Sequence, residues 1–178
     1  MKGKTRKIDV SRVNDAYFVN AAGVGISSEL TSGLRPAVKK IFGTFAYATA
    51  VASRWRQHRP FTVEISGTLE LRRSVIQVTV ANGKYYGGGM AVHRDARIDD
   101  GELTVLLIEA KPLWRHLMHI TNLKRGVYDF DAPFLVGSAT KLHIRTRKAR
   151  RIVADGEDAT HTPASFEVLP KALEVFVP

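Results

Sequence analysis

The sequence contains no cysteine, no long apolar run and fewer acidic than basic residues. Without cysteine the chain has neither a disulfide framework nor a thiolate metal site, which fits a reducing compartment. No apolar stretch approaches the roughly 18 residues that a membrane-spanning helix requires. The basic segment from Met1 to Lys7 is followed by no apolar segment, so no secretory signal is predicted. We therefore expect a cytoplasmic protein.

What the chain has in excess is positive charge. Its 27 lysine and arginine residues exceed its 17 aspartate and glutamate residues, which gives a formal net charge of +10. This surplus favours polyanionic partners such as acidic lipid headgroups, nucleotides or nucleic acid, without choosing among them. A length of 178 residues, of which 44% are hydrophobic, is enough for one domain with a buried core. We treat residues 1–178 as that single domain.

Most of the chain has the residue pattern of short β-strands. Apolar and polar residues alternate over residues 61–65 and again over 68–71, and Ser66-Gly67 between them predicts a two-residue hairpin. Residues 103–108 are apolar except for Thr104, as in a strand that is covered on both faces. The other expected strands are residues 16–19, 75–80, 142–144, 151–154, 166–169 and 173–177.

Two segments have helical spacing of apolar residues instead. The first runs from Pro36 to about Gln57, with Pro36 suited to a first helical turn. The second runs from Pro112 to Lys124, and Gly126 is placed to cap its C-terminal end. Many short strands separated by turns, together with these helices, predict a mainly β fold: an antiparallel β-sandwich with two helices.

Two local patterns suggest sites but are better explained otherwise. Gly23-Val24-Gly25 resembles the start of a dinucleotide-binding loop, but Ser28 stands where a third glycine is needed. No Walker A sequence is present either. His116 and His119 lie three residues apart on the second helix, without the glutamate of a zinc-binding H-E-x-x-H pattern. An amphipathic helix is the favoured interpretation of that segment.

A basic segment surrounds the predicted strand at residues 142–144. Strand alternation places Lys141, His143, Arg145 and Arg147 on one face. That face is either an ordinary solvated surface or a surface that attracts anionic lipid. Nucleic acid is the less favoured polyanion, because no aromatic residues are interleaved for base stacking.

Three further segments combine turn residues with polar groups. Gly87-Gly88-Gly89 follows Asn82-Gly83, and such a glycine run forms a plain loop or lets the backbone approach another group closely. Asp100-Gly101 precedes the strand at 103–108, and Asp155-Gly156 follows the strand at 151–154. Asp-Gly is first of all a turn signal. Two acidic corners in so basic a chain also suggest magnesium binding or proton transfer.

The order of these segments resembles the C-terminal domain of the diacylglycerol kinase and sphingosine kinase superfamily, in particular the bacterial lipid kinases that are not membrane-embedded. The resemblance runs from about Ile8 to Pro178 and rests on the ordered set of segments rather than on any one of them. The segments are Phe18 to Gly25, a helix containing Gly43 and Tyr47, Val80 to Gly83, Tyr86 to Met90, Asp100 to Val105, Asp155 to Glu157, and Phe166 to Leu173.

The resemblance implies a β-sandwich that receives a lipid and closes over a cleft, while a separate N-terminal domain binds ATP. It implies that Glu157 accepts the proton of the lipid hydroxyl. It also implies a structural Mg²⁺ held by Asp100 and by the backbone carbonyls of Arg97 and Glu102. The lipid, such as diacylglycerol, would be contacted by Asn82 and by Gly87, Gly88 and Gly89, in a protein that is cytoplasmic and peripheral to an anionic membrane.

The sequence departs from this family in one large respect. The family's Gly-Gly-Asp-Gly-Thr motif, which binds ATP, occurs nowhere in the 178 residues. Phosphoryl transfer depends on positioning ATP and its metal, so this chain is expected to be inactive alone. Three alternatives stay open: a truncated half of a lipid kinase, a half completed by a separate nucleotide-binding chain, or a non-catalytic module that binds anionic lipid. Self-association through the uncovered face is a further open alternative.

Overall fold

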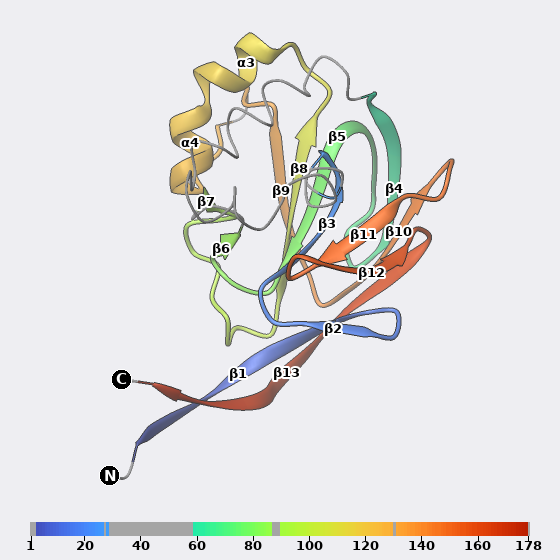
Figure 1. Cartoon of the computed structure of the whole chain (residues 1–178). Helices are drawn as coiled ribbons and strands as arrows, with labels where there is room; N and C mark the ends of the chain where they lie inside the picture. The colour runs from blue at the N-terminus through green and yellow to red at the C-terminus, as the bar shows by residue number, and fades with distance from the viewer. Residues whose placement is uncertain (1–2, 27, 29–58, 87–89, 130, 178) are drawn as a thin grey trace, which may run out of the picture.

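Antiparallel strands dominate the computed structural model, which describes residues 3–26, 28, 59–86, 90–129 and 131–177 (Figure 1). The mainly β prediction is confirmed. The predicted helix at residues 36–57 lies outside the described residues. Eleven strands join one sheet, and β6 (Tyr85–Tyr86) and β7 (Met90–Ala91) form a separate pair. The strands of the main sheet are β1 (Lys4–Val13), β2 (Ala16–Phe18), β3 (Ala21–Gly25), β4 (Phe61–Gly67), β5 (Leu71–Ala81), β8 (Leu103–Glu109), β9 (Phe134–Ala139), β10 (Lys141–Thr146), β11 (Arg151–Ala154), β12 (Glu157–His161) and β13 (Ala164–Val177).

The sheet branches at β5, so the predicted sandwich of two separate sheets needs correction. The first half of β5 pairs with β4, the second half pairs with β3, and β8 also pairs with β5. One side then continues through β10, β13, β1 and β2, and the other through β11 and β12. Because β5 is 11 residues long, it has room for both sets of partners, and the two layers stay joined as one hydrogen-bonded sheet.

Gly25 stands where the sheet divides. Its φ of +118° is a conformation that side chains with a Cβ rarely adopt. A Cβ atom there would lie 2.3 Å from the carbonyl oxygen of Ile76. Antiparallel pairing of β3 with both β5 and β11 also confirms that Gly23-Val24-Gly25 is not a dinucleotide-binding loop.

The core follows the alternation that the sequence displays. Phe61, Val63 and Ile65 of β4 are buried, while Thr62 and Glu64 are exposed. The apolar run of β8 is buried on both faces, as predicted, because its residues pack alternately into two clusters. Leu103, Val105 and Leu107 join the main cluster, whereas Leu106 joins a smaller one with Ala81, Val92, Ala96, Ala132 and Phe134.

The predicted two-residue hairpin at Ser66-Gly67 is wrong. Both residues still belong to β4. The last pair between β4 and β5 is Ile65 with Leu71, so residues 66–70 separate the paired positions instead of two residues. Gly67 pairs instead with Leu142 of β10. The close approach of this third strand explains the glycine: a Cβ atom on Gly67 would lie 2.9 Å from the carbonyl oxygen of Lys141.

The strands predicted at residues 166–169 and 173–177 form one strand, β13. It pairs along its length with β1. The register of this pairing shifts between Ile8 and Val10. Lys171 lies on β13 opposite this shift and has a positive φ of +53°. The outer halves of β1 and β13 are largely exposed and project as a ribbon that carries both chain ends (Figure 1). Figure 1 places this ribbon at the bottom of the view, away from the helices.

The predicted helix at residues 112–124 forms two short helices, α3 (Leu113–Met118) and α4 (Ile120–Arg125), with a break at His119. Gly126 caps α4 in the left-handed conformation, as predicted. His116 is the buried residue of α3, with Nδ1 3.1 Å from the Pro112 oxygen and Nε2 3.1 Å from the Glu109 oxygen. Burial lowers the pKa of His116 below its usual value, against the opposing effect of those carbonyls. The amphipathic interpretation is wrong for α3, because Trp114, Leu117 and Met118 are exposed while the polar His116 is buried.

Three glycine variants test the branching of the sheet. We expect Gly25→Ala to lower the free energy of unfolding by more than about 2 kcal/mol, because both its φ and the Ile76 carbonyl oppose a side chain. Gly156→Ala, with a φ of +92° but no neighbour within 4 Å, is expected to cost about 1 kcal/mol. Gly83→Ala has neither obstacle and serves as the control. Equal unfolding midpoints for the three in urea would contradict the account.

Candidate functional site

The Asp155-Gly156 corner is a tight turn between β11 and β12. Ala154 pairs directly with Glu157 across it, and Asp155 and Gly156 have φ values of +48° and +92°. Asp-Gly is favoured in two-residue hairpin turns because both central residues need positive φ. The turn predicted from the sequence is therefore confirmed.

The Asp155 side chain holds a second segment against this corner. Its carboxylate accepts hydrogen bonds from the backbone N–H groups of Val19 at 2.7 Å, Asn20 at 3.0 Å and Ala21 at 2.9 Å. Val19 and Asn20 connect β2 to β3, and Ala21 is the first residue of β3. The sequence shows Asp155 only as a turn residue, since nothing local indicates that it binds a segment more than 130 positions away.

Glu157 lies beside this corner as the first residue of β12. Its side chain is exposed, and within the part of the chain that the structure describes its carboxylate forms no hydrogen bond or ion pair. The neighbouring Asp158, by contrast, is held by Arg151 at 3.0 Å. The carboxylate of Glu157 is thus not committed to stabilising the fold, and its role as proton acceptor stays a prediction.

The Asp100-Gly101 corner is built by a local loop. Asp100 Oδ2 accepts the backbone N–H of Arg97 at 3.0 Å, and Oδ1 accepts that of Glu102 at 3.0 Å. The side chain of Asp100 is exposed. A carboxylate has about four acceptor positions, so two amide contacts fix its orientation and leave capacity for a cation.

The same loop offers the oxygen ligands that Mg²⁺ requires. Mg²⁺ prefers oxygen ligands and keeps several waters, so one carboxylate and two carbonyls are a sufficient protein contribution. Arg97 and Glu102, whose carbonyls would join Asp100, are the residues whose N–H groups already hold its carboxylate. Asp99 is occupied differently: hydrogen bonds from Arg6 and Arg97 hold the pKa of its carboxyl below the usual range. Within the described ranges, no three or more His, Asp or Glu side chains gather as a metal site.

A buried carboxylate missed by the sequence analysis ties this loop to the rest of the fold. Asp9 is 0% exposed, and its two oxygens accept the N–H groups of Gly101 and Lys171, each at 2.7 Å. Its backbone N–H donates to the carbonyl of Ile98 at 2.8 Å. Asp9 lies at the register shift between β1 and β13, so it fills the place where the ladder is interrupted.

Asn82 connects the two acidic corners. Its Nδ2 donates to the carbonyl of Asp9 at 2.8 Å and to that of Val19 at 3.0 Å, and its backbone N–H donates to Asn20 at 2.9 Å. Val19 and Asn20 are in turn held by Asp155. Asn82 is 1% exposed, so here it organises the backbone of both corners. Its predicted contact with lipid stays a prediction, and Gly87, Gly88 and Gly89 lie outside the described residues.

The outward face of β10 agrees with the alternation predicted for it. Lys141 and Arg145 are exposed and His143 is half-buried, whereas Leu142 and Ile144 between them are buried. Arg147 follows the end of the strand and is exposed too. Among the described helices, none has the length and apolar character to cross a bilayer.

Replacing Asp155 tests the connection between its corner and the β2–β3 segment. We expect Asp155→Asn to lower the free energy of unfolding by about 1–3 kcal/mol, since an amide NH₂ would face one of the three backbone N–H donors. Asn tolerates the positive φ, so backbone strain is not the cause. The matched control is Asp158→Asn, which removes an exposed ion pair and should cost under about 1 kcal/mol. Urea unfolding that shows equal losses would contradict this role.

Comparison with known proteins identifies the family of the chain that contains these corners. The family model described as "YegS C-terminal NAD kinase beta sandwich-like domain" matches residues 23–177. A diacylglycerol kinase of Bacillus subtilis is 26% identical over 181 residues and is covered to 59% of its length by all of this chain. A Pseudomonas putida protein described as "Probable lipid kinase YegS-like" is 25% identical over 172 residues, which are 96% of this chain and 56% of that protein.

Solved structures show the same fold. One whose description names a diacylglycerol kinase of Bacillus anthracis strain Sterne superposes with a TM-score of 0.82 at 23% identity, over 98% of this chain and 59% of that one. The chain thus spans little more than half the length of these relatives. The resemblance derived from the ordered motifs is confirmed. This chain belongs to the family of YegS C-terminal NAD kinase beta sandwich-like domains, the C-terminal domain of diacylglycerol-kinase-type lipid kinases.

Proposed function

We propose that this chain is the lipid-substrate domain of a diacylglycerol-kinase-like enzyme. In the complete enzyme, the γ-phosphoryl group of ATP would pass to a lipid hydroxyl, with ATP held by a nucleotide-binding half that these 178 residues do not contain. The observation that carries the proposal is the family match over residues 23–177, which includes both acidic corners. Their connection through Asp9, Asn82 and Asp155 supports it, because a reaction site needs fixed geometry.

The proposed chemistry assigns proton transfer to Glu157. The lipid hydroxyl oxygen attacks the γ-phosphorus, its proton passes to the Glu157 carboxylate, and the bond from that phosphorus to the β–γ bridging oxygen breaks to release ADP. An exposed carboxylate with no competing partner among the described residues suits this task once a second domain and a lipid cover it. Mg²⁺ held by Asp100 and the carbonyls of Arg97 and Glu102 would supply a fixed positive charge that stabilises its loop.

The projecting ribbon of β1 and β13 supports a contact with the nucleotide-binding half. Phe176 is 82% exposed and Leu173 is 40% exposed, both on the outer half of β13. Exposed apolar groups on a projecting ribbon are typical of a surface that another domain covers. The lipid substrate, diacylglycerol or a similar alcohol, would reach the site from a membrane that the protein visits as a peripheral cytoplasmic enzyme.

Reconstitution tests this function. The chain is mixed with the separately produced nucleotide-binding half of the Bacillus subtilis diacylglycerol kinase, and transfer of labelled phosphate from ATP to diacylglycerol in mixed micelles is measured. We expect no transfer by the chain alone and measurable transfer by the mixture. Glu157→Gln should reduce the rate by about 10²–10⁴-fold, the usual worth of a general base. The control is Asp158→Asn on the same strand, and a Glu157→Gln rate equal to it would refute the assignment.

A second candidate function is a non-catalytic module that binds anionic membranes. It is favoured by the surface of α3, where Trp114 is 59%, Leu117 56% and Met118 70% exposed. Tryptophan prefers the boundary between water and lipid, and the net charge of +10 would favour anionic headgroups.

Co-sedimentation with vesicles tests the membrane-binding surface of α3. For the membrane module, we expect Trp114→Ala with Met118→Ala to weaken binding to vesicles of mixed neutral and anionic lipid by about tenfold, since two exposed apolar groups are lost. The control is Tyr17→Ala, which removes an aromatic side chain of similar exposure, 62%, from β2. Unchanged vesicle binding by the α3 variant would exclude this surface.

A further inference from the structure

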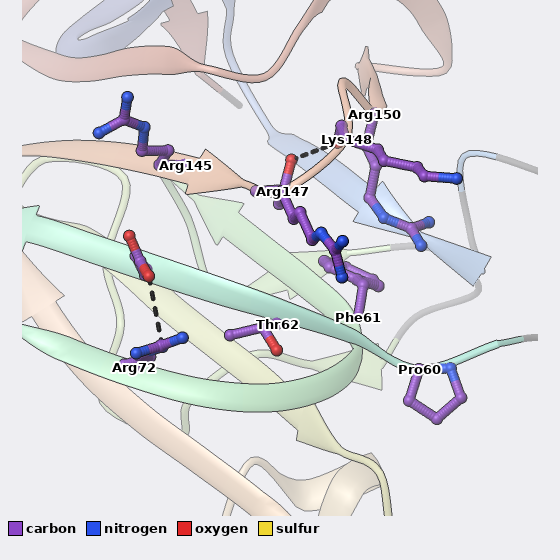
Figure 2. Close-up of a pocket in the computed structure, with 10 residues that line it drawn as sticks. Pro60, Phe61, Thr62, Arg72, Arg145, Arg147, Lys148 and Arg150 are labelled. Carbon is purple, nitrogen blue, oxygen red and sulfur yellow. Dashed lines mark hydrogen bonds and ion pairs between the residues drawn. The ribbon is translucent and has the colours of Figure 1, made fainter.

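A basic pocket lies between β4, β5 and the loop that joins β10 to β11, and neither acidic corner contributes to it. Its volume is about 640 Å³. Figure 2 shows its side chains, with the guanidinium group of Arg150 beside Phe61. The lining residues are Pro60, Phe61, Thr62, Glu64, Arg72, Arg145, Thr146, Arg147, Lys148 and Arg150.

The charges of this basic pocket are strongly unbalanced. Among its described lining residues, five are cationic and only Glu64 is anionic. Glu64 forms an ion pair with Arg72 at 3.3 Å and stands opposite Arg145 in the strand register, so its charge is already compensated. For Arg145, Arg147 and Lys148, no carboxylate partner occurs in the described part of the chain. An anion entering the pocket would therefore meet cations that are not already neutralised there.

The loop that carries these cations is held in place by hydroxyl groups. Thr146 Oγ1 donates to the carbonyl of Lys148 at 2.8 Å. Thr162, which is 2% exposed, accepts the N–H of Arg150 on Oγ1 at 2.9 Å and donates its own N–H to the carbonyl of Arg150 at 2.9 Å. The hydroxyls of Thr146 and Thr162 also contact each other. Loop positions fixed in this way lower the ordering cost that a ligand must overcome.

Phe61 forms the inner wall of the basic pocket and positions one of its cations. The guanidinium of Arg150 lies 3.9 Å from the centre of the Phe61 ring, a cation–π contact. Phe61 is itself 8% exposed, so the ring is part of the core rather than a mobile side chain. Arg150 is thereby kept beside the opening rather than extended into solvent.

The basic pocket and the Asp155 corner lie at opposite ends of β11. The loop residues precede Arg151, and the corner follows Ala154, so the whole strand separates them. Four residues of a β-strand span roughly 13 Å. An anion in the pocket is therefore not the triphosphate that the proposed reaction would place beside Glu157.

We propose that this basic pocket binds a phosphate group, through Arg147 and Lys148. Guanidinium groups match phosphate geometry with two parallel N–H donors, and charged hydrogen bonds of this kind are stronger than neutral ones. The pocket is larger than an inorganic phosphate ion, so it has room for the organic part of a phosphate monoester. The group comes either from a lipid headgroup or from a small dissolved phosphate compound. This inference does not depend on the proposed lipid kinase function.

The first measurement follows backbone amide NMR signals of the complete 178-residue chain during titration with inorganic phosphate and, separately, glycerol 3-phosphate. Sodium chloride at the same ionic strength is the reference. We expect saturable shifts in residues 145–150 with both phosphates and none with chloride. Arg147→Gln with Lys148→Gln should weaken the binding about tenfold or more, since two charged contacts are lost. The control, Arg94→Gln with Lys124→Gln, removes the same charge from exposed positions elsewhere and should bind like the original chain.

The second measurement identifies the source of the phosphate. Vesicles containing phosphatidate or phosphatidylglycerol at equal surface charge are compared by co-sedimentation. Preference for phosphatidate that the pocket variant loses supports a lipid headgroup, and dissolved phosphate binding without that preference supports a small phosphate compound. The proposal is overturned if phosphate and chloride shift the same signals equally, or if pocket and control variants lose binding equally. Binding only to RNA or DNA, with a steep salt dependence, would also overturn it.

Discussion

Hydrogen bonds made by Asp9, Asn82 and Asp155 hold both acidic corners of this domain, with Asn82 donating to the backbone carbonyl of Asp9 rather than to its carboxylate. Burying a carboxylate is unfavourable unless its oxygens find donors, and Asp9 finds them in the N–H groups of Gly101 and Lys171. Asn82 carries the connection onward to Val19, whose N–H donates to Asp155. Segments that are far apart in sequence therefore share one polar junction.

The rest of the fold determines where the two acidic corners and the basic pocket lie. The branched sheet supplies two layers over a common core, and the corners lie where strands end rather than within the ladder. Side chains at such positions can remain exposed while their backbone is fixed, as those of Asp100 and Glu157 show. The basic pocket at the other end of β11 has the same arrangement: Thr146 and Thr162 fix the backbone of a loop that carries cationic side chains. The proposed phosphate binding and the proposed catalysis thus occupy separate regions of one domain.

Much of this could be predicted from sequence because it is encoded locally. Alternation identified the buried face of β4, the largely apolar run identified β8, and Gly126 identified the end of α4. Asp155-Gly156 encodes its own turn through positive φ at both residues. The ordered motifs were sufficient to identify the family.

What could not be predicted depends on contacts between distant segments. The outer half of β1 is charged and exposed, so it lacks the apolar pattern of a strand and forms only because β13 pairs with it. Gly67 resembles a hairpin residue, but the third strand, β10, determines its conformation. Asp9 has no local signature at all, since its partners lie 92 and 162 positions away. The branching at β5 likewise follows from pairing rather than from composition.

The most direct test of the central claim is a crystal structure of this chain assembled with the nucleotide-binding half of a relative, a non-hydrolysable ATP analogue and a short-chain diacylglycerol. The account predicts the Glu157 carboxylate within about 3 Å of the lipid hydroxyl, a usual hydrogen-bond distance for a general base. It also predicts that hydroxyl in line with the γ-phosphorus. A Glu157 side chain directed into solvent, with the diacylglycerol bound elsewhere, would contradict it.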